Sequence, residues 1–266
     1  MKIVVCIKQV PVSNEIGVNK KDGTVNRQRA KTKLNPYDLY ALETAFRMRE
    51  KLGGTITVLT MGPLQAEKVI RDAFMMGADY GYILSDKMFS GSDVLATSFT
   101  LAQGIHLIEE ADLILCGRQT TDGDTAQIGP SIAEHLNIPH AAWVEEVRNV
   151  DETCITVCQN FAQVTQISKI KFPCLLTVEK GIFVPRLPSY RLKKTAMEKP
   201  IQTITFADLA NQDITNYGLT GSPTHVERIF KPESNRKQQY LAGNAKEKSE
   251  SLLSFLQKEK FIQEVE

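Results

Sequence analysis

The chain has 266 residues, of which 42% are apolar and 24% charged, as is usual for a globular protein with one large core. Lysine and arginine number 32 against 31 aspartates and glutamates, so the net charge is +1, which argues against whole-molecule attraction to nucleic acid or anionic membrane. No run reaches the roughly 18 apolar residues that membrane insertion requires, and residues 1–8 resemble a strand more than a signal peptide.

The first half of the chain alternates strand and helix patterns. Residues 2–10 form an apolar run typical of a strand buried on both faces. A polar stretch with Asp22-Gly23, a hairpin or loop signal, leads to Asn35-Pro36. Asn suits the helix N-cap and Pro the first helical position, so we expect a helix there that ends at Gly53-Gly54.

Three further strands and helices follow with short connections, which predicts a parallel sheet wound by right-handed crossovers. The expected strands are 55–61, 80–84 and 111–116, and the expected helices are 64–76, one capped by Ser92 and running to 110, and one from Thr125 to His135.

After Pro139 the pattern changes to closely spaced strands at 143–150, 153–160, 164–170 and 173–178, with a turn at 150–153. Their period-2 alternation favours antiparallel pairing added to the parallel core. The core is expected to end near residue 185. Residues 186–266 form a basic segment, a turn-rich stretch and an amphipathic helix at 246–261, which together suit an extended arm laid over a partner.

The cysteines and histidines indicate neither disulfides nor metal. Five cysteines are scattered without a C-x-x-C pair, and four histidines lack zinc-ligand spacing. We expect reduced core cysteines in a cytoplasmic protein.

A ligand crevice is predicted where the parallel strands end. Residues 6–8, Met61-Gly62 and the loop after Cys116 should meet there, because ligands of such sheets lie at the carboxyl ends of the strands. The loop 117–127 is rich in glycine, aspartate and threonine, and a helix N-terminus with a Thr125 hydroxyl suits a pyrophosphate. Its aspartates could cap the helix or bind ribose hydroxyls, and an ordinary capped turn remains the alternative.

Other chemistries lack their motifs. The sequence contains no G-x-G-x-x-G after a strand, no G-K-[ST] and no G-x-S-x-G, so side-chain catalysis has no candidate and a bound cofactor must carry any difficult chemistry. A second binding candidate is the helix start at 35–38, which could hold an adenosine if it faces the crevice.

Several motifs occur together in an order that resembles the electron transfer flavoprotein β (small) subunit. The longest is Gly117-Arg-Gln-Thr-Thr-Asp-Gly-Asp-Thr-Ala-Gln-Ile-Gly-Pro130; the others are Val5-Cys-Ile-Lys-Gln-Val-Pro11, Asn35-Pro-Tyr-Asp38, Met61-Gly-Pro63, Met76-Gly-Ala-Asp79 and Pro173-Cys-Leu-Leu-Thr-Val178. The similarity covers roughly residues 1–200, and the long final arm also fits.

The resemblance implies an α/β, doubly wound, mainly parallel sheet of the adenine-nucleotide-hydrolase-like type, with a nucleotide (FAD)-binding domain at 1–185 and a partner-binding loop and arm at 186–266. It also implies an obligate electron transfer flavoprotein α subunit. The family's non-bifurcating β subunits hold AMP as a structural ligand. Its bifurcating β subunits carry Asp-Gly-Asp-Thr-Ala-Gln in the loop, as residues 122–127 do here, and hold FAD.

In the bifurcating type, the resemblance implies hydride exchange between this FAD and NAD(H). Electrons are then divided between ferredoxin and, through FAD in the α subunit, a partner flavoprotein dehydrogenase. An AMP-holding scaffold is the alternative within the family, and a stand-alone ATP-binding stress-type module the alternative outside it.

The resemblance also assigns site residues by position. The adenosine side is assigned to Cys6, Asn35, Pro36, Tyr37, Asp38 and Met61. The phosphate and ribityl side is assigned to Gln119, Asp122, Gly123, Asp124, Thr125, Ala126, Gln127 and Ile128, with Arg118 as a partner for a flavin or nicotinamide oxygen. The segment 184–194 lies where family members meet the dehydrogenase, so Leu187, Tyr190 and Arg191 are expected to contact it; a solvated linker is the alternative. One departure is residues 159–166, which lack the acids and glycines that the family's hairpin carries.

Overall fold

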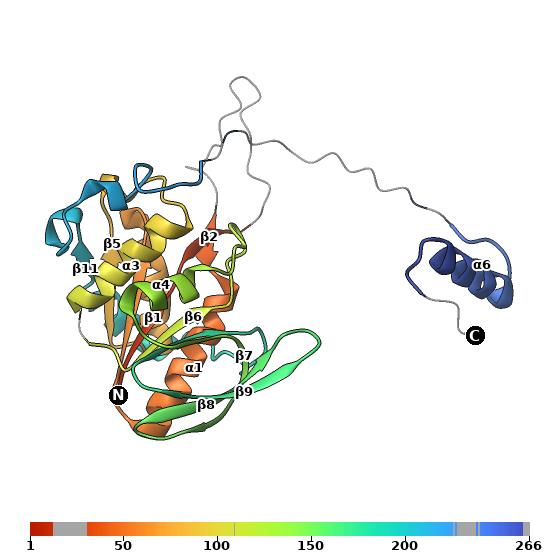
Figure 1. Ribbon diagram of the computed structural model, residues 1–266. Coiled ribbons are helices and arrows are strands. Elements are labelled where there is room, and N and C mark those ends of the chain that lie inside the picture. Colours follow the sequence, from red (N-terminus) through yellow and green to blue (C-terminus); the bar gives the residue numbers. More distant parts are fainter. Residues whose placement is uncertain (13–30, 109, 226, 228–237, 239, 263–266) are drawn as a thin grey trace. The chain divides into compact units, whose positions relative to one another are not determined.

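The computed structural model describes residues 1–12, 31–108, 110–225, 227, 238 and 240–262, and it divides the chain into two compact units, Met1–His225 and Val226–Glu266 (Figure 1). The predicted loop with Asp22-Gly23 lies outside the described residues.

A nine-stranded sheet forms the centre of the first unit and confirms the predicted fold class. Its strands, in spatial order, are β11 (Gln202–Ile204), β5 (Tyr80–Leu84), β4 (Thr55–Met61), β1 (Lys2–Cys6), β6 (Leu113–Gly117), β10 (Cys174–Val178), β7 (His140–Val150), β8 (Cys154–Asn160) and β9 (Thr165–Lys171). All pairs from β11 to β7 are parallel, and β7–β8–β9 are antiparallel. A separate antiparallel pair joins β2 (Gln9–Pro11) to β3 (Thr32–Leu34).

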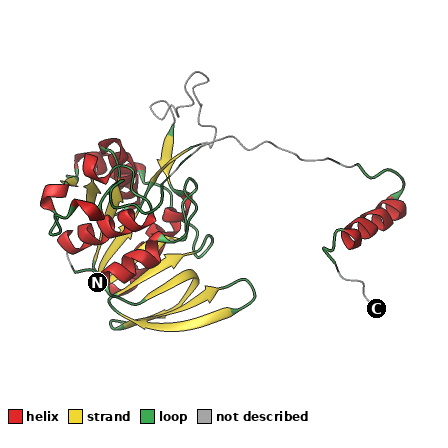
Figure 2. Ribbon diagram, turned by 45° about the horizontal axis from the view of Figure 1, so that its top comes forward, coloured by secondary structure: helices red, strands yellow, loops and turns green. Residues whose placement is uncertain are grey.

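Helices cover both faces of the parallel part, whereas the antiparallel strands extend beyond them (Figure 2). On one face the core is filled by α1 (Pro36–Leu52), α2 (Glu67–Met76) and Ala196 of the short α5 (Lys193–Glu198). On the other face it is filled by α3 (Val94–Ile108) and α4 (Ile128–Leu136). Strand β1 shows the alternation: Ile3 and Val5 face the first layer, and Val4 faces the second.

The strand order reverses beside β1. The chain passes outward from β1 through α1, β4 and α2 to β5, and α3 then brings it back to β6 on the other side of β1. Cys6 and Cys116 are register partners at the carboxyl ends of β1 and β6. In a doubly wound sheet this switch point is where a ligand crevice forms.

Several local predictions differ from the structure. The predicted strand 2–10 is divided into β1 and β2, which belong to different sheets. Strand β10 pairs in parallel with β6 and β7, because it enters the middle of the sheet, where all five of its residues are buried. Helix α3 begins after Asp93, whose Oδ1 accepts from the Ala96 amide at 3.1 Å, whereas Ser92 donates to the Phe89 carbonyl. Asn35 precedes α1 as predicted but makes no side-chain cap bond to it.

The first unit includes residues 186–225, part of which completes the core. Strand β11 pairs with β5, and the Tyr217 ring is buried against Phe89, Phe99 and Phe206. In the second unit, α6 (Ala245–Lys258) confirms the predicted helix and is capped by a reciprocal pair of bonds between Asn244 and Glu247. Within the described residues, no helix has both the length and the apolar character needed to cross a membrane.

Candidate functional site

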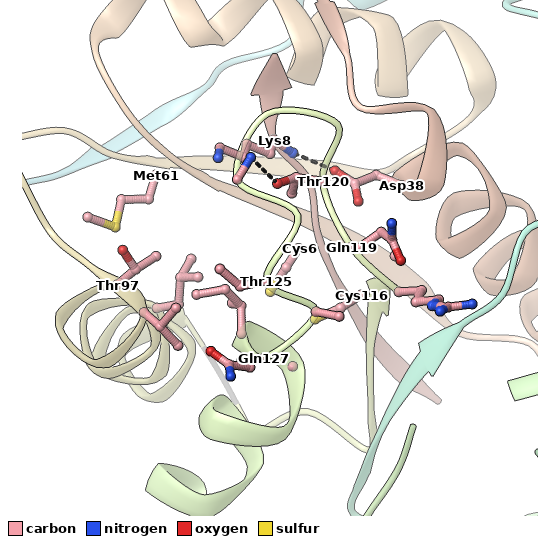
Figure 3. A pocket seen from close by; sticks show the side chains of 18 of the residues that line it. Cys6, Lys8, Asp38, Met61, Thr97, Cys116, Gln119, Thr120, Thr125 and Gln127 are labelled. Atoms are coloured by element: carbon pink, nitrogen blue, oxygen red, sulfur yellow. Dashed lines mark hydrogen bonds between the residues drawn. The ribbon is translucent and has the colours of Figure 1, made fainter. Parts of the chain in front are cut away.

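A cavity of about 250 Å³ lies at the switch point. Its walls come from the ends of β1, β4 and β6, the start of α1, the loop between β6 and α4, and one side of α3. In Figure 3, Met61 and Thr97 lie on one side of the cavity and Asp38 and Gln119 on the other. The cavity therefore occupies the place that the strand pattern predicted for a ligand.

The β6–α4 loop leaves the sheet in close contact with α1. A Cβ on Gly117 would lie 2.5 Å from Asp38 Oδ1 and 2.7 Å from the Tyr37 carbonyl carbon, so this position has no room for a side chain. Further along, Asp124 and Ala126 have left-handed φ values of 55° and 57°. The left-handed conformation is strained for an alanine, so Ala126 adopts it only because the surrounding structure holds it there.

The predicted helix start at Thr125 is wrong, since α4 begins at Ile128. Within the described part of the chain no side chain caps α4, so neither aspartate of the loop has the capping role that the sequence left open. The first amides of a helix have no intrahelical partner, and together with the partial positive charge of the helix N-terminus they favour an anion.

Both aspartates of the loop are engaged with other side chains. Asp122 Oδ2 lies 2.8 Å from Lys8 Nζ, and Asp124 accepts a hydrogen bond from the Gln119 amide. Burial by itself would raise the pKa of Asp122, but hydrogen bonds from Lys8 and Thr120 and the Lys8 charge bring it below its usual value. The Lys8 ammonium thus offsets the Asp122 charge, which reduces repulsion toward a phosphate.

Gly123 differs from Gly117 because the fold does not require a glycine there. A Cβ on Gly123 would meet only Thr120 Oγ1, at the ordinary contact distance of 3.6 Å, and its φ is not left-handed. The backbone at Gly123 lines the cavity. The packing of the described residues does not explain why position 123 is a glycine. The absence of a side chain there does leave room for a ligand to approach the backbone closely.

Asn35 and Asp38 tie the start of α1 to the loop. The Asn35 amide donates to Asp38 Oδ1 at 2.8 Å and to the Gln119 carbonyl at 2.9 Å, and its Oδ1 accepts from the Thr121 amide. Asp38 Oδ2 accepts from the Lys8 backbone amide at 2.7 Å. Burial raises the pKa of Asp38 to about 7, although the hydrogen bond from Asn35 and those from the Lys8 and Gly117 backbone lower it in part.

Cys6 and Cys116 contribute buried thiols to the wall of the cavity. A hydrogen bond with Cys6, followed by burial, raises the pKa of the Cys116 thiol well above its usual value. This thiol is therefore protonated at neutral pH, and it adds a compact, weakly polar surface to the cavity without a nucleophile.

Arg118 brings a fixed positive charge to the edge of the cavity. Its Nη1 lies 2.6 Å from Glu179 Oε2, and its guanidinium carbon lies 4.3 Å from the centre of the Trp143 ring. The Trp143 backbone has a left-handed φ of 59° beside an irregularity in the β7–β10 register, and its amide donates to Thr177 Oγ1. Arg118 lines the cavity, and its Nε is buried and has no hydrogen-bond partner within the described residues.

The structure brings most of the predicted cofactor residues to this cavity but not all. The predicted residues that line it are Cys6, Asp38, Met61, Arg118, Gln119, Gly123, Thr125, Ala126, Gln127 and Ile128. The predicted residues outside its lining are Asn35, Pro36, Tyr37, Asp122 and Asp124. Of these, Asn35 and Asp122 hold the lining residues in place through the bonds described above. The predicted dehydrogenase contacts Leu187, Tyr190 and Arg191 lie in an exposed segment that does not line the cavity.

Sequence reasoning missed the wall formed by α3. Val94, Thr97 and Leu101 line the cavity, as does Ser92 just before the helix. Their spacing of three and four residues is that of one helical face, and the return of α3 across the sheet places this face at the switch point. The polar Thr97 on an otherwise apolar face was the available signal.

The described residues contain no group of three or more His, Cys, Asp or Glu side chains that could hold a metal ion. The five cysteines are free and buried, as predicted.

Comparisons with known proteins show which family this chain resembles. Residues 22–209 match the family model described as the electron transfer flavoprotein domain. The electron transfer flavoprotein subunit beta of Thermoanaerobacterium thermosaccharolyticum is 41% identical over 96% of this chain and 98% of its own length. The protein FixA of Sinorhizobium fredii is 43% identical over 87% of this chain and 84% of its own. The caffeyl-CoA reductase-Etf complex subunit CarD of Acetobacterium woodii is 40% identical over 98% of this chain and 100% of its own.

Proposed function

Because this chain belongs to the electron transfer flavoprotein family, as one of its β subunits, we propose that its cavity holds FAD and that the protein works in a heterodimer with an α subunit. Bound there, FAD would supply hydride exchange with NAD(H) and the division of two electrons between ferredoxin and, through the α subunit, a flavoprotein dehydrogenase.

The observation that carries this proposal is the geometry of Gly123. The loop exposes backbone to the cavity at a glycine that the fold does not need, next to left-handed residues and an uncapped helix start. Backbone amides and a helix N-terminus suit a pyrophosphate, because they direct donors and partial positive charge toward its negative oxygens. Lys8 and Gln119 bind the aspartates of this loop. The Gly123 amide donates to Asp122 Oδ1 at 2.8 Å and the Asp124 amide to the Thr120 carbonyl at 3.1 Å, so the donors offered to a pyrophosphate are the first amides of α4.

The other walls suit the remaining parts of a dinucleotide. Asp38 and Met61 offer polar and apolar contacts for an adenosine, and the Arg118 guanidinium offers a donor for a ring oxygen. The Cys6 and Cys116 side chains add compact, weakly polar surface to the cavity. No side chain of the cavity takes part in bond breaking; the residues bind, orient and exclude water.

The bifurcating type is supported by the loop sequence Asp122-Gly-Asp-Thr-Ala-Gln127 and by similarity to a subunit named for a caffeyl-CoA reductase-Etf complex. The size of the cavity supports the alternative, a structural AMP. At about 250 Å³ it is smaller than the roughly 300–1,000 Å³ of most cofactor pockets, so FAD binding requires that part of the flavin extend beyond this cavity.

We propose further that the second unit, Val226–Glu266, is an arm that binds the α subunit. Its helix α6 exposes the apolar side chains of Leu252, Leu253 and Phe255, and such side chains suit packing against a partner. Deleting residues 226–266 should abolish stoichiometric co-purification with the α subunit without unfolding the first unit, because Tyr217 and β11 are retained. A truncated chain that still pairs stoichiometrically contradicts the arm proposal.

The cofactor proposal is tested by Gly123→Val in the co-expressed αβ complex. The branched side chain should displace the flavin bound in this subunit and leave the flavin of the α subunit in place, so that the FAD content falls by half. Thr121→Val is the matched control, since Thr121 belongs to the same loop but does not line the cavity; its FAD content should equal that of the wild type. Loss of both flavins, or of neither, contradicts the placement.

A further inference from the structure

Residues 184–192, here named the docking segment, expose apolar side chains at a regular interval. Val184, Leu187 and Tyr190 are 87%, 86% and 87% exposed. The interval of three residues is that of a polyproline II helix, which Pro185 and Pro188 favour because their φ angles are fixed. The end of the segment, Tyr190–Leu192, is a short 3-10 helix in which the Leu192 amide donates to the Ser189 carbonyl at 3.1 Å. A polyproline II chain has no internal hydrogen bonds, so the conformation of the part before Ser189 depends on contacts with the rest of the protein.

Arg186, which lies between the first two exposed side chains, is fixed to α1. Arg186 donates three hydrogen bonds to the Glu43 carboxylate: from its backbone amide at 3.0 Å, from Nε at 2.8 Å and from Nη2 at 3.0 Å. The guanidinium also lies 4.5 Å from the centre of the Phe46 ring. A bidentate guanidinium–carboxylate pair fixes direction as well as distance.

Glu43 itself is buried, with only 1% of its side chain exposed. It also accepts from Arg47 Nε at 2.8 Å, so two guanidinium groups satisfy one carboxylate. Burial favours the neutral acid, but the hydrogen bonds from Arg186 and Arg47 outweigh it and keep the pKa of Glu43 below its usual value. Burying a carboxylate without such partners would cost folding free energy. Glu43 therefore favours the one arrangement of the segment in which Arg186 reaches it.

The rest of the segment is held by α2. The Ser189 amide donates to the Met75 carbonyl at 2.8 Å. Beyond the segment, Arg71 donates to the carbonyls of Ala196 and Lys199, and the Lys199 ammonium returns to the Ala78 carbonyl. The exposed side chains thus stand on a backbone that is fixed at Arg186, at Ser189 and after α5.

We propose that Glu43 is a positioning residue for partner docking: it holds the docking segment so that Val184, Leu187 and Tyr190 form a rigid apolar ridge that fits a groove on the dehydrogenase. This inference rests on the proposed function and on the docking proposal, that residues 184–194 meet the dehydrogenase as the family resemblance implies.

The charges around the ridge define the chemistry of the groove. Arg191, Lys193 and Lys194 follow the ridge directly and are exposed. An apolar groove bordered by carboxylates is complementary to this arrangement, and a preorganised ridge binds without the entropy cost of ordering a loop.

The test uses the αβ complex and an acyl-CoA dehydrogenase, reduced by its substrate, as the varied electron donor. Glu43→Gln should raise the KM for the dehydrogenase about tenfold, as expected when a charge-assisted bond to a buried group is weakened, with kcat, FAD content and NADH oxidation unchanged. Glu50→Gln is the matched control, because Glu50 pairs with the same Arg186 but is half exposed; its KM should change less than twofold. Arg186→Lys, which keeps the charge, should give an intermediate KM.

A second measurement reports on the segment without the partner. Amide hydrogen exchange at Arg186 and Ser189 should be faster in Glu43→Gln than in the wild type. If Tyr190→Ala raises the KM and Glu43→Gln changes neither KM nor exchange, the anchoring role is overturned and the docking proposal stands. If neither variant changes the KM, the docking proposal and the inference both fail. A fall in FAD content in Glu43→Gln would make its role structural and would also overturn the inference.

Discussion

The nucleotide cavity and the docking segment place their functional groups in opposite ways. In the cavity, backbone and short side chains meet at the ends of buried strands, and glycine allows α1 to approach β6 within contact distance. In the docking segment, the functional side chains are almost fully exposed and only Arg186 connects them to a buried charge. Substitutions where the cavity wall is packed against the core, as at Gly117 and Asp38, should therefore change stability, whereas substitutions on the ridge should change binding alone.

The largest expected effect comes from Asp38. Its carboxyl has a pKa of about 7 in the folded protein and about 3.8 when unfolded, so the folded state holds an additional proton between these values. Stability should then fall as pH rises from 5 to 7, by about 2–3 kcal/mol from this group, and level off above pH 7. Urea unfolding of the wild type and Asp38→Asn at each pH isolates the contribution; parallel curves would contradict it.

Gly117 and Gly123 allow a comparison within the cavity between a glycine that packing requires and a glycine that leaves room for a ligand. Gly117→Ala places a Cβ against the Tyr37 backbone, so we expect a loss of about 1–3 kcal/mol in the free energy of unfolding, as for other overpacked sites. Gly123→Ala meets no close atom of the chain and should stay within about 0.5 kcal/mol of the wild type. Thermal or urea unfolding measures both, and equal losses would remove the distinction between a glycine required by the fold and one required by a ligand.

The Lys8–Asp122 ion pair should contribute less to the free energy of unfolding, because both side chains are partly exposed. Lys8→Gln is expected to cost less than about 1 kcal/mol, and the difference should shrink in high salt. Urea unfolding at low and high ionic strength tests this. A larger cost that salt does not change would show that the pair is part of the buried structure.

Tyr190→Ala should have the smallest effect on stability, within about 0.5 kcal/mol, because the side chain is exposed. Its effect on electron transfer from the dehydrogenase should nevertheless exceed that of Lys8→Gln. Unfolding by urea and steady-state kinetics on the same preparation give both values. If Tyr190→Ala unfolds more easily than Gly117→Ala, the contrast between the two regions is wrong.

Local signals were sufficient for much of the fold. Strands β4 and β5 have their predicted bounds. β4 is an apolar run between Gly54 and Gly62, and β5 is a short run of aromatic and aliphatic residues between Asp79 and Ser85. The cavity position followed from the strand order alone. The parallel pairing of β10 was missed because β8 and β9 lie between it and β7 in the sequence, and alternation alone does not specify which strand a segment joins.

Contacts between distant residues were beyond sequence reasoning. Glu43 and Arg186 are 143 positions apart, and a glutamate on a helix is ordinarily a solvated residue. The α3 wall of the cavity was missed for a similar reason, because its side chains meet the loop only after the chain has crossed the sheet. The left-handed Trp143 under Arg118 depends on a register irregularity between strands that no local pattern encodes.

The central claim is that this subunit binds a flavin. It is tested most directly by denaturing the co-expressed αβ complex and quantifying the released FAD and AMP. Two FAD and no AMP per heterodimer is the predicted result and would place a redox-active cofactor in this chain. One FAD with one AMP would contradict the claim, and the chain would then be a structural subunit whose cavity holds AMP.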